Sequence, residues 1–500
     1  MRPTPPIWPA TRPWADRAGM HQLSGLDAEF LAMESATVFG HVGSVCLLDP
    51  STAPEPLTLA RLTRLIAERL PLVPLFRRRL MPAPLGLDQP YWVDDPDVDL
   101  AHHVRELALP APGGDVDLAR QVGSLHARPL DRSRPLWEIY LITGLQGGRA
   151  AIYSKVHHAA IDGVSGDDIL AAVLDPSPHG RRTSRPGTSP PLAASPGRLG
   201  LLARTGWSLI KQPVRVVRLG TDLARRSPQL AVAAAERLPL SAPLLDHVRP
   251  DDAVLAHPGL RAPHTPFNAS ISPDRSWARA DLSLTEVRRI KNDAGGSVND
   301  VVMALVAGAL RRWLLDHHAL PPEPLVAAVP VSIRTHEQDG TFGNRVSVML
   351  AALPTNVSAP VQRLAAATAA MHAAKREHAS IPPTLLADAF GLALPAMANL
   401  AWRVAARLRV MERVNPFNLF VSNVPGPSLP LYYAGAQLLG YYPVSAIAHG
   451  QGLNITVASY RDRLCFGLLA CPQLVPDLEV MAGYLAVELE TLAASTANPG

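Results

Sequence analysis

The sequence predicts an α/β protein with two lobes, and three observations support this prediction. The chain has 500 residues, a length typical of two or three domains. Helix-like and strand-like segments alternate on both sides of a Pro/Ser/Arg-rich stretch, residues 175–200, which has the composition of a flexible linker. The stretch from Val414 to Tyr460 lacks Asp, Glu, Lys and Arg, but five prolines and five glycines divide it. It therefore predicts short buried strands and turns rather than a membrane span.

The N-terminal half begins with residues 1–20, which contain no long apolar run and predict a disordered extension without a secretory signal. Met20 could be the true start. Residues 21–174 form the first predicted lobe. Near its end, Ala151 to Val156 predicts a strand, and Gly166 to Leu174 predicts a short helix after an intervening turn.

Beyond the linker, residues 201–275 mix basic and apolar side chains and predict basic amphipathic helices followed by a crossover segment. Such helices either pack with a solvated basic face or contact a membrane surface. The second predicted lobe, residues 276–500, opens with helices at Leu282 to Ile290 and Asn299 to Leu315. Its predicted strands are residues 418–421, 437–439, 453–459 and 464–469.

Composition excludes several classes of protein. Hydrophobic residues make up 47% of the chain and charged residues 18%, which is typical of a globular protein. The formal charge is +4, but no dense run of basic residues alternates with aromatic ones, so we expect no nucleic-acid partner. Cys46, Cys465 and Cys471 have no paired spacing, which predicts reduced thiols and a cytoplasmic location.

The most informative motif runs from His157 to Gly163 and reads His-His-Ala-Ala-Ile-Asp-Gly. A neutral imidazole at the end of a strand can accept a proton from an attacking hydroxyl or thiol. Adjacent side chains on an extended backbone point in opposite directions, so one histidine at most faces a given pocket. A metal site at His158 and Asp162 is disfavoured, because the turn breaks helical register and no third ligand has suitable spacing. A serine triad lacks its Gly-x-Ser-x-Gly elbow.

Two other histidine pairs predict structural roles. His102 and His103 lie beside several aspartates in a predicted surface loop and strand, where we expect solvated side chains. His317 and His318 follow a predicted helix, whose C-terminal end favours positive charge.

The His-His-x-x-x-Asp-Gly motif resembles that of the chloramphenicol acetyltransferase-like superfamily, which includes CoA-dependent acyltransferases and peptide-synthetase condensation domains. Further segments are similar to the bacterial wax ester synthase/acyl-CoA:diacylglycerol acyltransferase family, in the same order from Leu23 to Glu490. They are Leu23–Asp27 with Phe30–Leu31, Pro135–Glu138, Thr265–Asn268, Asn299–Val302, Pro330–Arg334, Gly343–Ser347 and Ser422–Pro427.

This resemblance implies two lobes, each a mixed β-sheet flanked by helices, with the active site in a tunnel at their junction. It implies transfer of a fatty acyl group from acyl-CoA to diacylglycerol or a long-chain fatty alcohol, without a covalent acyl-enzyme. Acyl-CoA is then a co-substrate, and neither a metal nor another cofactor is expected. A peripheral place on the inner membrane face or on lipid droplets is compatible with this activity.

The resemblance also implies roles for single residues. His158 becomes the general base and His157 supports it, while Asp162 holds the loop, with Arg334 as a candidate partner. Asn299 places the substrate or the oxyanion, or else caps its helix, and Asp300 is structural.

Four further residues are candidates for substrate binding. Pro135, Leu136 and Trp137 either line an acyl tunnel or pack in the core. Gly163 permits the tight backbone turn after Asp162 and is a candidate for contact with substrate.

Two alternatives stay open. A condensation-type enzyme acting on carrier-protein thioesters shares the histidine motif but lacks the Asn-Val-Pro-Gly-Pro and Pro-Leu-Trp segments. A non-catalytic relative that binds lipid droplets needs no proton acceptor, so the intact motif favours an enzyme.

Overall fold

The computed structural model describes residues 20–84, 88–161, 170, 172–181, 262–332, 346–379, 404, 407 and 415–497. The predicted N-terminal extension up to residue 19 lies outside this part of the chain. So do most of the predicted linker and basic segment, Asp162, Gly163 and Arg334. The predictions for these residues therefore remain predictions.

The N-terminal lobe is built on a six-stranded mixed sheet with the strand order β12-β13-β2-β7-β6-β5. Its strands are β12 (Tyr432–Tyr433), β13 (Ala436–Val444), β2 (His41–Asp49), β7 (Ala150–His157), β6 (Trp137–Thr143) and β5 (Val104–Ala108). The predicted strand at residues 151–156 is confirmed as β7. Because β2 and β6 flank β7 as antiparallel partners, the strand that carries the histidine motif lies inside the sheet.

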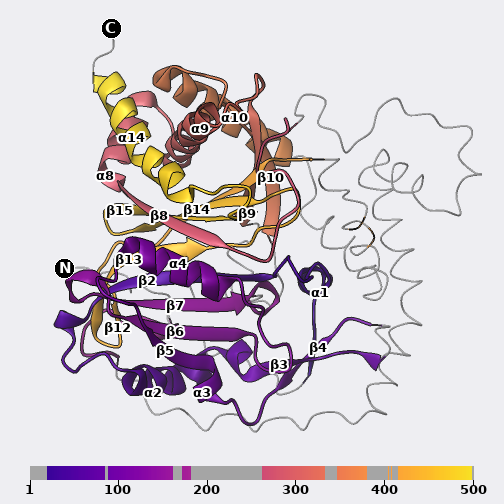
Figure 1. The fold of residues 1–500 in the computed structure, drawn as a ribbon, viewed down its shortest axis with the longest axis vertical. Helices are drawn as coiled ribbons and strands as arrows, with labels where there is room; N and C mark the ends of the chain where they lie inside the picture. Colours follow the sequence, from indigo (N-terminus) through magenta and orange to yellow (C-terminus); the bar gives the residue numbers. More distant parts are fainter. Residues whose placement is uncertain are drawn as a thin grey trace, which may run out of the picture.

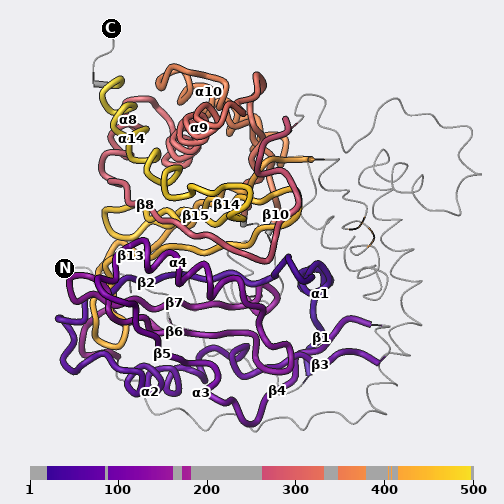
Figure 2. Tube along the Cα trace, viewed as in Figure 1, coloured from indigo at the N-terminus to yellow at the C-terminus, as the bar shows by residue number. Residues whose placement is uncertain are grey.

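Helices and a small second sheet complete this lobe. The helices are α1 (Gly25–Ala32), α2 (Leu59–Arg69), α3 (Leu100–His103) and α4 (Asp115–His126). The small sheet consists of β1 (His21–Gln22), β4 (Tyr91–Asp94) and β3 (Arg78–Met81), in that order, and lies close to α1 (Figure 2).

The C-terminal lobe holds a second six-stranded sheet with the order β10-β9-β11-β14-β15-β8. Its strands are β10 (Val346–Leu353), β9 (Leu325–Ser332), β11 (Leu419–Val424), β14 (Leu453–Tyr460), β15 (Arg463–Ala470) and β8 (Ser276–Ser283). The helices α8 (Leu284–Ala294), α9 (Val298–Asp316), α10 (Pro360–Ala379) and α14 (Leu478–Ala497) cover the face away from the N-terminal lobe (Figure 1). The two mixed sheets and their helices confirm the predicted α/β class with two lobes.

Two boundaries differ from the sequence prediction. The helix predicted from Leu282 begins at Leu284, because Leu282 and Ser283 still pair with β15 and Ser283 caps the helix. The β12–β13 segment, which we assigned to the C-terminal lobe, pairs with β2 and completes the N-terminal sheet. The C-terminal half of the chain therefore contributes to both lobes. The four strands predicted between residues 418 and 469 are confirmed within β11, β13, β14 and β15.

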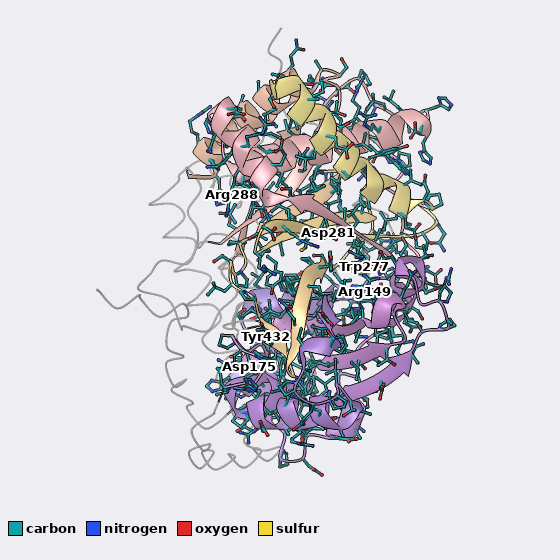
Figure 3. The ribbon with its side chains drawn as sticks, turned by 90° about the vertical axis from the view of Figure 1, so that its left-hand side faces the viewer. Arg149, Asp175, Trp277, Asp281, Arg288 and Tyr432 are labelled. Carbon is teal, nitrogen blue, oxygen red and sulfur yellow. The ribbon has the colours of Figure 1, made fainter. Side chains whose placement is uncertain are left out.

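The lobes meet through close backbone contacts. A Cβ built on Gly467 of β15 would lie 1.8 Å from the carbonyl oxygen of Pro443 in β13, so only glycine permits this approach. The indole of Trp277 donates to the same carbonyl oxygen at 3.3 Å. Figure 3 shows Trp277 and Asp281 at this junction.

At the far end of β13, the short strand β12 ties the crossing segment to the N-terminal lobe. Asp175 forms an isolated bridge with Tyr432, which lies beside it in Figure 3, and its buried carboxylate accepts from Arg69 of α2 at 3.0 Å.

Two further features follow from burial. Cys46, Cys465 and Cys471 are all buried and free of disulfides, as predicted for reduced thiols. Among the described helices, none combines the length and the apolar character that crossing a bilayer demands.

Candidate active site

The candidate site begins where β7 ends. His157 is the last residue of the strand, and residues 158–160 form one turn of 3-10 helix. Nδ1 of His157 accepts a hydrogen bond from the backbone N–H of Ala159 at 3.1 Å. Because a carboxylate oxygen only accepts, Nε2 of the same ring donates to Oε1 of Glu34 at 3.1 Å. His157 thus links the turn to Glu34, and its supporting role in catalysis stays a prediction.

Glu34 contacts the histidine motif, and the sequence analysis did not identify it. Its Oε1 also accepts from the backbone N–H of Gly40 at 2.8 Å, and its Oε2 accepts from Arg132 at 3.0 Å. Burial alone would raise the pKa of this carboxyl, but the hydrogen bond from His157 and the nearby charges outweigh burial and lower it to about 2. The carboxylate is therefore ionised at neutral pH and anchors the turn electrostatically.

His158, the first residue of the 3-10 turn, has different partners from His157. Its backbone N–H donates to the carbonyl oxygen of Gly40 at 2.8 Å, and its ring stacks on Phe30 of α1 with centroids 4.0 Å apart. The residue stays partly exposed, whereas His157 is 1% exposed. Burial of the ring lowers the pKa of His158 to about 4, and the neighbouring His157 adds to this effect. The imidazole is therefore neutral at pH 7.

Gly40 fits this arrangement only because it has no side chain. A Cβ at this position would lie 2.7 Å from Nε2 of His157 and 3.0 Å from the carbonyl oxygen of Phe30. The segment from α1 to β2 thus contacts both motif histidines: Glu34 contacts His157, Phe30 contacts His158, and Gly40 lies against both.

Asn299 lies at the second position of α9, and the structure removes one of its two interpretations. Ser297 caps the helix, and Asp300 completes a capping box by accepting from the Ser297 backbone N–H at 2.8 Å. The alternative that Asn299 caps α9 is therefore wrong, while the structural role predicted for Asp300 is confirmed. Oδ1 of Asn299 accepts a long hydrogen bond of 3.4 Å from Nδ2 of Asn423 in β11.

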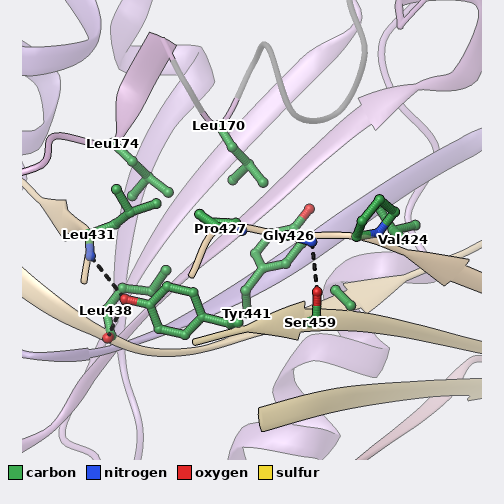
Figure 4. Close-up of a pocket in the computed structure, with 12 residues that line it drawn as sticks. Leu170, Leu174, Val424, Gly426, Pro427, Leu431, Leu438, Tyr441 and Ser459 are labelled. Atoms are coloured by element: carbon green, nitrogen blue, oxygen red, sulfur yellow. Dashed lines mark hydrogen bonds between the residues drawn. The ribbon is translucent and has the colours of Figure 1, made fainter. Parts of the chain in front are cut away.

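Two apolar cavities lie close to these residues. The first is small and lies between the Val424–Pro427 loop, β13 and Leu170, as Figure 4 shows. The second encloses about 100 Å³ against β2 and β7. Leu170 and Tyr441 line both cavities.

The second cavity reaches the histidine turn. Val156 and Ile161, which bracket the motif histidines, contribute to its wall. The polar residues Ser44 and Ser154 also line it, but their hydroxyls hydrogen-bond to each other at 2.8 Å. The remaining lining is largely apolar. Such a surface suits an alkyl chain better than a polar ligand.

The predicted binding residues Pro135, Leu136 and Trp137 lie at the start of β6. Leu136 and Trp137 are each 1% exposed, and the indole of Trp137 stacks on Phe76 and donates to its carbonyl oxygen at 3.0 Å. Phe76, on which Trp137 stacks, lines the second cavity. A role of these three residues in acyl binding stays a prediction.

The other histidine pairs lie apart from this site. His103 is buried, stacks on Trp137 and bonds its carbonyl oxygen at 2.7 Å, so the expectation of a solvated side chain is wrong for this residue. His317 ends α9, as predicted, and bonds the carbonyl oxygen of Trp313 at 2.7 Å. Within the described ranges, no group of three His, Cys, Asp or Glu side chains could hold a metal ion.

The two mixed sheets, with the motif histidines where β7 ends, give the two-lobed arrangement that the sequence resemblance implies. The model of the wax ester synthase/diacylglycerol acyltransferase catalytic domain matches residues 23–302, and that of the family's C-terminal domain matches residues 342–493. The chain belongs to the wax ester synthase/diacylglycerol acyltransferase family.

Individual relatives agree with this assignment. A Mycobacterium tuberculosis protein named as a diacylglycerol O-acyltransferase is 37% identical over 490 residues, covering 96% of this chain and 92% of the relative. The solved wax ester synthase/diacylglycerol acyltransferase from Marinobacter aquaeolei VT8 is 30% identical with a TM-score of 0.66, covering 95% and 100% of the two chains. A trichothecene 15-O-acetyltransferase from Fusarium sporotrichioides, 14% identical with a TM-score of 0.59 and coverage of 98% for each chain, shares the fold.

Proposed function

We propose that this protein transfers a fatty acyl group from acyl-CoA to diacylglycerol, to a long-chain fatty alcohol, or to both. The observation that carries the proposal is the neutral imidazole of His158, held at a strand end beside an apolar cavity. The names of the relatives support the two acceptor classes. A lipid-binding protein without activity would have no use for such a proton acceptor.

The proposed reaction is a direct displacement. His158 takes the hydroxyl proton as the alcohol oxygen attacks the thioester carbon, the C–O bond forms, and the carbonyl oxygen becomes an oxyanion. The C–S bond then breaks, and the imidazolium returns its proton to the CoA thiolate. The products are an ester and free CoA, and no acyl group becomes attached to the protein.

A developing oxyanion needs a hydrogen-bond donor placed in advance. Asn299 is the candidate, because its side chain lies in the first turn of α9, where backbone dipoles also favour negative charge. Asp162 and Gly163, outside the described residues, are proposed to hold the loop after the histidines. Peripheral contact with a membrane or lipid droplet through the basic segment, residues 201–275, belongs to the same proposal.

The decisive assay measures thiol release from palmitoyl-CoA with hexadecanol, with diacylglycerol, and with neither. Release that depends on an acceptor supports the proposal, and the acceptor that gives the faster release identifies the preferred product. His158→Ala should lower the rate by about two orders of magnitude or more and leave the melting temperature nearly unchanged. A folded variant with near-normal turnover would contradict the role of His158. Equal release without any acceptor would indicate hydrolysis instead.

A further inference from the structure

We infer that Asn423 is a positioning residue that orients the side-chain amide of Asn299 so that its NH₂ group faces the reacting thioester. The inference rests on the proposed function and adds a residue to it. Asn423 belongs to the Ser422–Pro427 segment, to which the sequence assigned no role beyond family resemblance.

The polarity of the amide pair carries the argument. An asparagine side chain has an acceptor oxygen on one branch and two N–H donors on the other, so fixing one branch fixes both. Nδ2 of Asn423 donates to Oδ1 of Asn299 at 3.4 Å. Nδ2 of Asn299 therefore points away from Asn423, and in the described part of the chain it has no protein acceptor. A donor held in this way is available to a substrate oxygen.

Asn423 can impose this orientation because its own backbone is fixed. It lies one residue before the end of β11 and pairs with Val457 of β14. Three residues later, the N–H of Gly426 donates to the hydroxyl of Ser459 at 2.8 Å, and a Cβ on Gly426 would come within 2.0 Å of the Ser459 carbonyl oxygen. The Pro-Gly-Pro sequence thus packs closely against β14 just after the end of β11.

Asn299 is fixed from its own side. The capping box of Ser297 and Asp300 encloses it within the first turn of α9. Both amides therefore extend from rigid elements of the C-terminal lobe, and neither depends on a loop for its position.

The residue next to Asn423 lines an apolar cavity that neighbours the one beside the histidine turn. Val424, the next residue after Asn423, lines the first cavity together with Leu170 and Tyr441. The same two residues line the second cavity, whose wall includes Val156 and Ile161 on either side of the motif histidines. The two cavities are therefore neighbours, one beside Val424 and the other beside the histidine turn.

The test replaces Asn423 with a residue of the same shape but opposite polarity. Asn423→Asp cannot donate to Oδ1 of Asn299, and it attracts the NH₂ group instead, which turns the oxygen of Asn299 toward the substrate. We expect kcat with palmitoyl-CoA and the better acceptor to fall about tenfold in Asn423→Ala and about a hundredfold in Asn423→Asp, the lower end of the scale for losing one oxyanion donor. KM for palmitoyl-CoA should stay within about threefold. Asn356→Asp, the same exchange at an exposed position, is the matched control and should leave kcat unchanged.

A double-mutant cycle separates positioning from simple support of the fold. Once Asn299→Ala has removed the amide, adding Asn423→Asp should lower kcat less than about twofold. If Asn423→Asp lowers kcat by the same factor in both backgrounds, or if its rate loss follows a loss of melting temperature shared with Asn423→Ala, the inference is wrong. Failure of the proposed function would look different, because the wild-type protein itself would then release no acceptor-dependent CoA.

Discussion

The substitution Glu34→Gln tests whether the buried carboxylate anchors the histidine turn by its charge. Glutamine preserves the shape of the side chain, and its oxygen can still accept from Gly40 and His157. Its NH₂ group replaces the oxygen that accepts from Arg132, so the change removes the charge together with the Arg132 contact. Lowering the pKa of Glu34 from 4.5 to about 2 contributes about 3 kcal/mol in favour of the folded state at pH 7. For a chain of this length, that loss lowers the melting temperature by about 3 °C.

The sign of the pH dependence follows from the direction of the shift. Because the pKa of Glu34 is lower in the folded state, its contribution is complete well above pH 4.5 and declines as the pH falls through about 2. At pH 3 the remaining contribution is about 1.4 kcal/mol. The gap in melting temperature between wild type and Glu34→Gln should therefore shrink by about half between pH 7 and pH 3.

Thermal unfolding at both pH values, together with kcat at pH 7, provides the measurement. Glu68→Gln on the exposed side of α2 is the matched control, and it should change neither the melting temperature nor its pH dependence. A gap between wild type and Glu34→Gln that is equally large at pH 7 and pH 3 would refute the electrostatic argument. We expect kcat to fall as well, since a loosened His157 no longer fixes the turn that carries His158.

Three further predictions follow from named contacts. Burial lowers the pKa of His158 to about 4, so about 97% of this imidazole is neutral at pH 5.5, against about 9% for an ordinary imidazole. Initial rates of thiol release should therefore be nearly equal at pH 7 and pH 5.5. A steep decline in rate below pH 6.5 would contradict this prediction. Gly40→Ala should lower kcat at least tenfold, since its Cβ would come within 2.7 Å of the His157 ring, whereas unchanged kinetics would show that the turn relaxes freely. Glu488→Gln leaves Arg363 buried beside a neutral partner, and it should lower the free energy of unfolding by about 3 kcal/mol without affecting KM. Denaturant titration measures this loss, and a clearly smaller value would show that water reaches the Arg363 guanidinium.

The parts of the fold that the sequence predicts are those fixed by local pattern. Strand β7, helix α9 and the strands between residues 418 and 469 follow from runs of apolar residues bounded by turn formers. The capping box at Ser297 was also visible as Ser-x-x-Asp before an apolar run, so the cap could have been assigned correctly from sequence.

What the sequence does not reveal depends on contacts between distant segments. Nothing in the local sequence of residues 432–444 indicates that they pair with β2 of the N-terminal lobe. The neighbour of a strand depends on which of its faces becomes buried, and this is decided by distant segments. Glu34 lies 123 residues before His157, and its neighbours in the chain give no sign of a partner. The neighbouring aspartates of His103 predict a surface position, but Trp137, 34 positions later in the chain, packs on its ring.

The low pKa of His158 also affects the two steps of the proposed reaction differently. An imidazole with a pKa of about 4 is a weak acceptor for the proton of a free alcohol, so removal of that proton must accompany formation of the C–O bond. The same weakness helps the second half of the reaction, because the imidazolium is a much stronger acid than a thiol and readily gives its proton to the departing thiolate. The first half then depends on how well the oxyanion is stabilised. Asn299 and Asn423 should therefore matter more for kcat than the basicity of His158 alone would suggest.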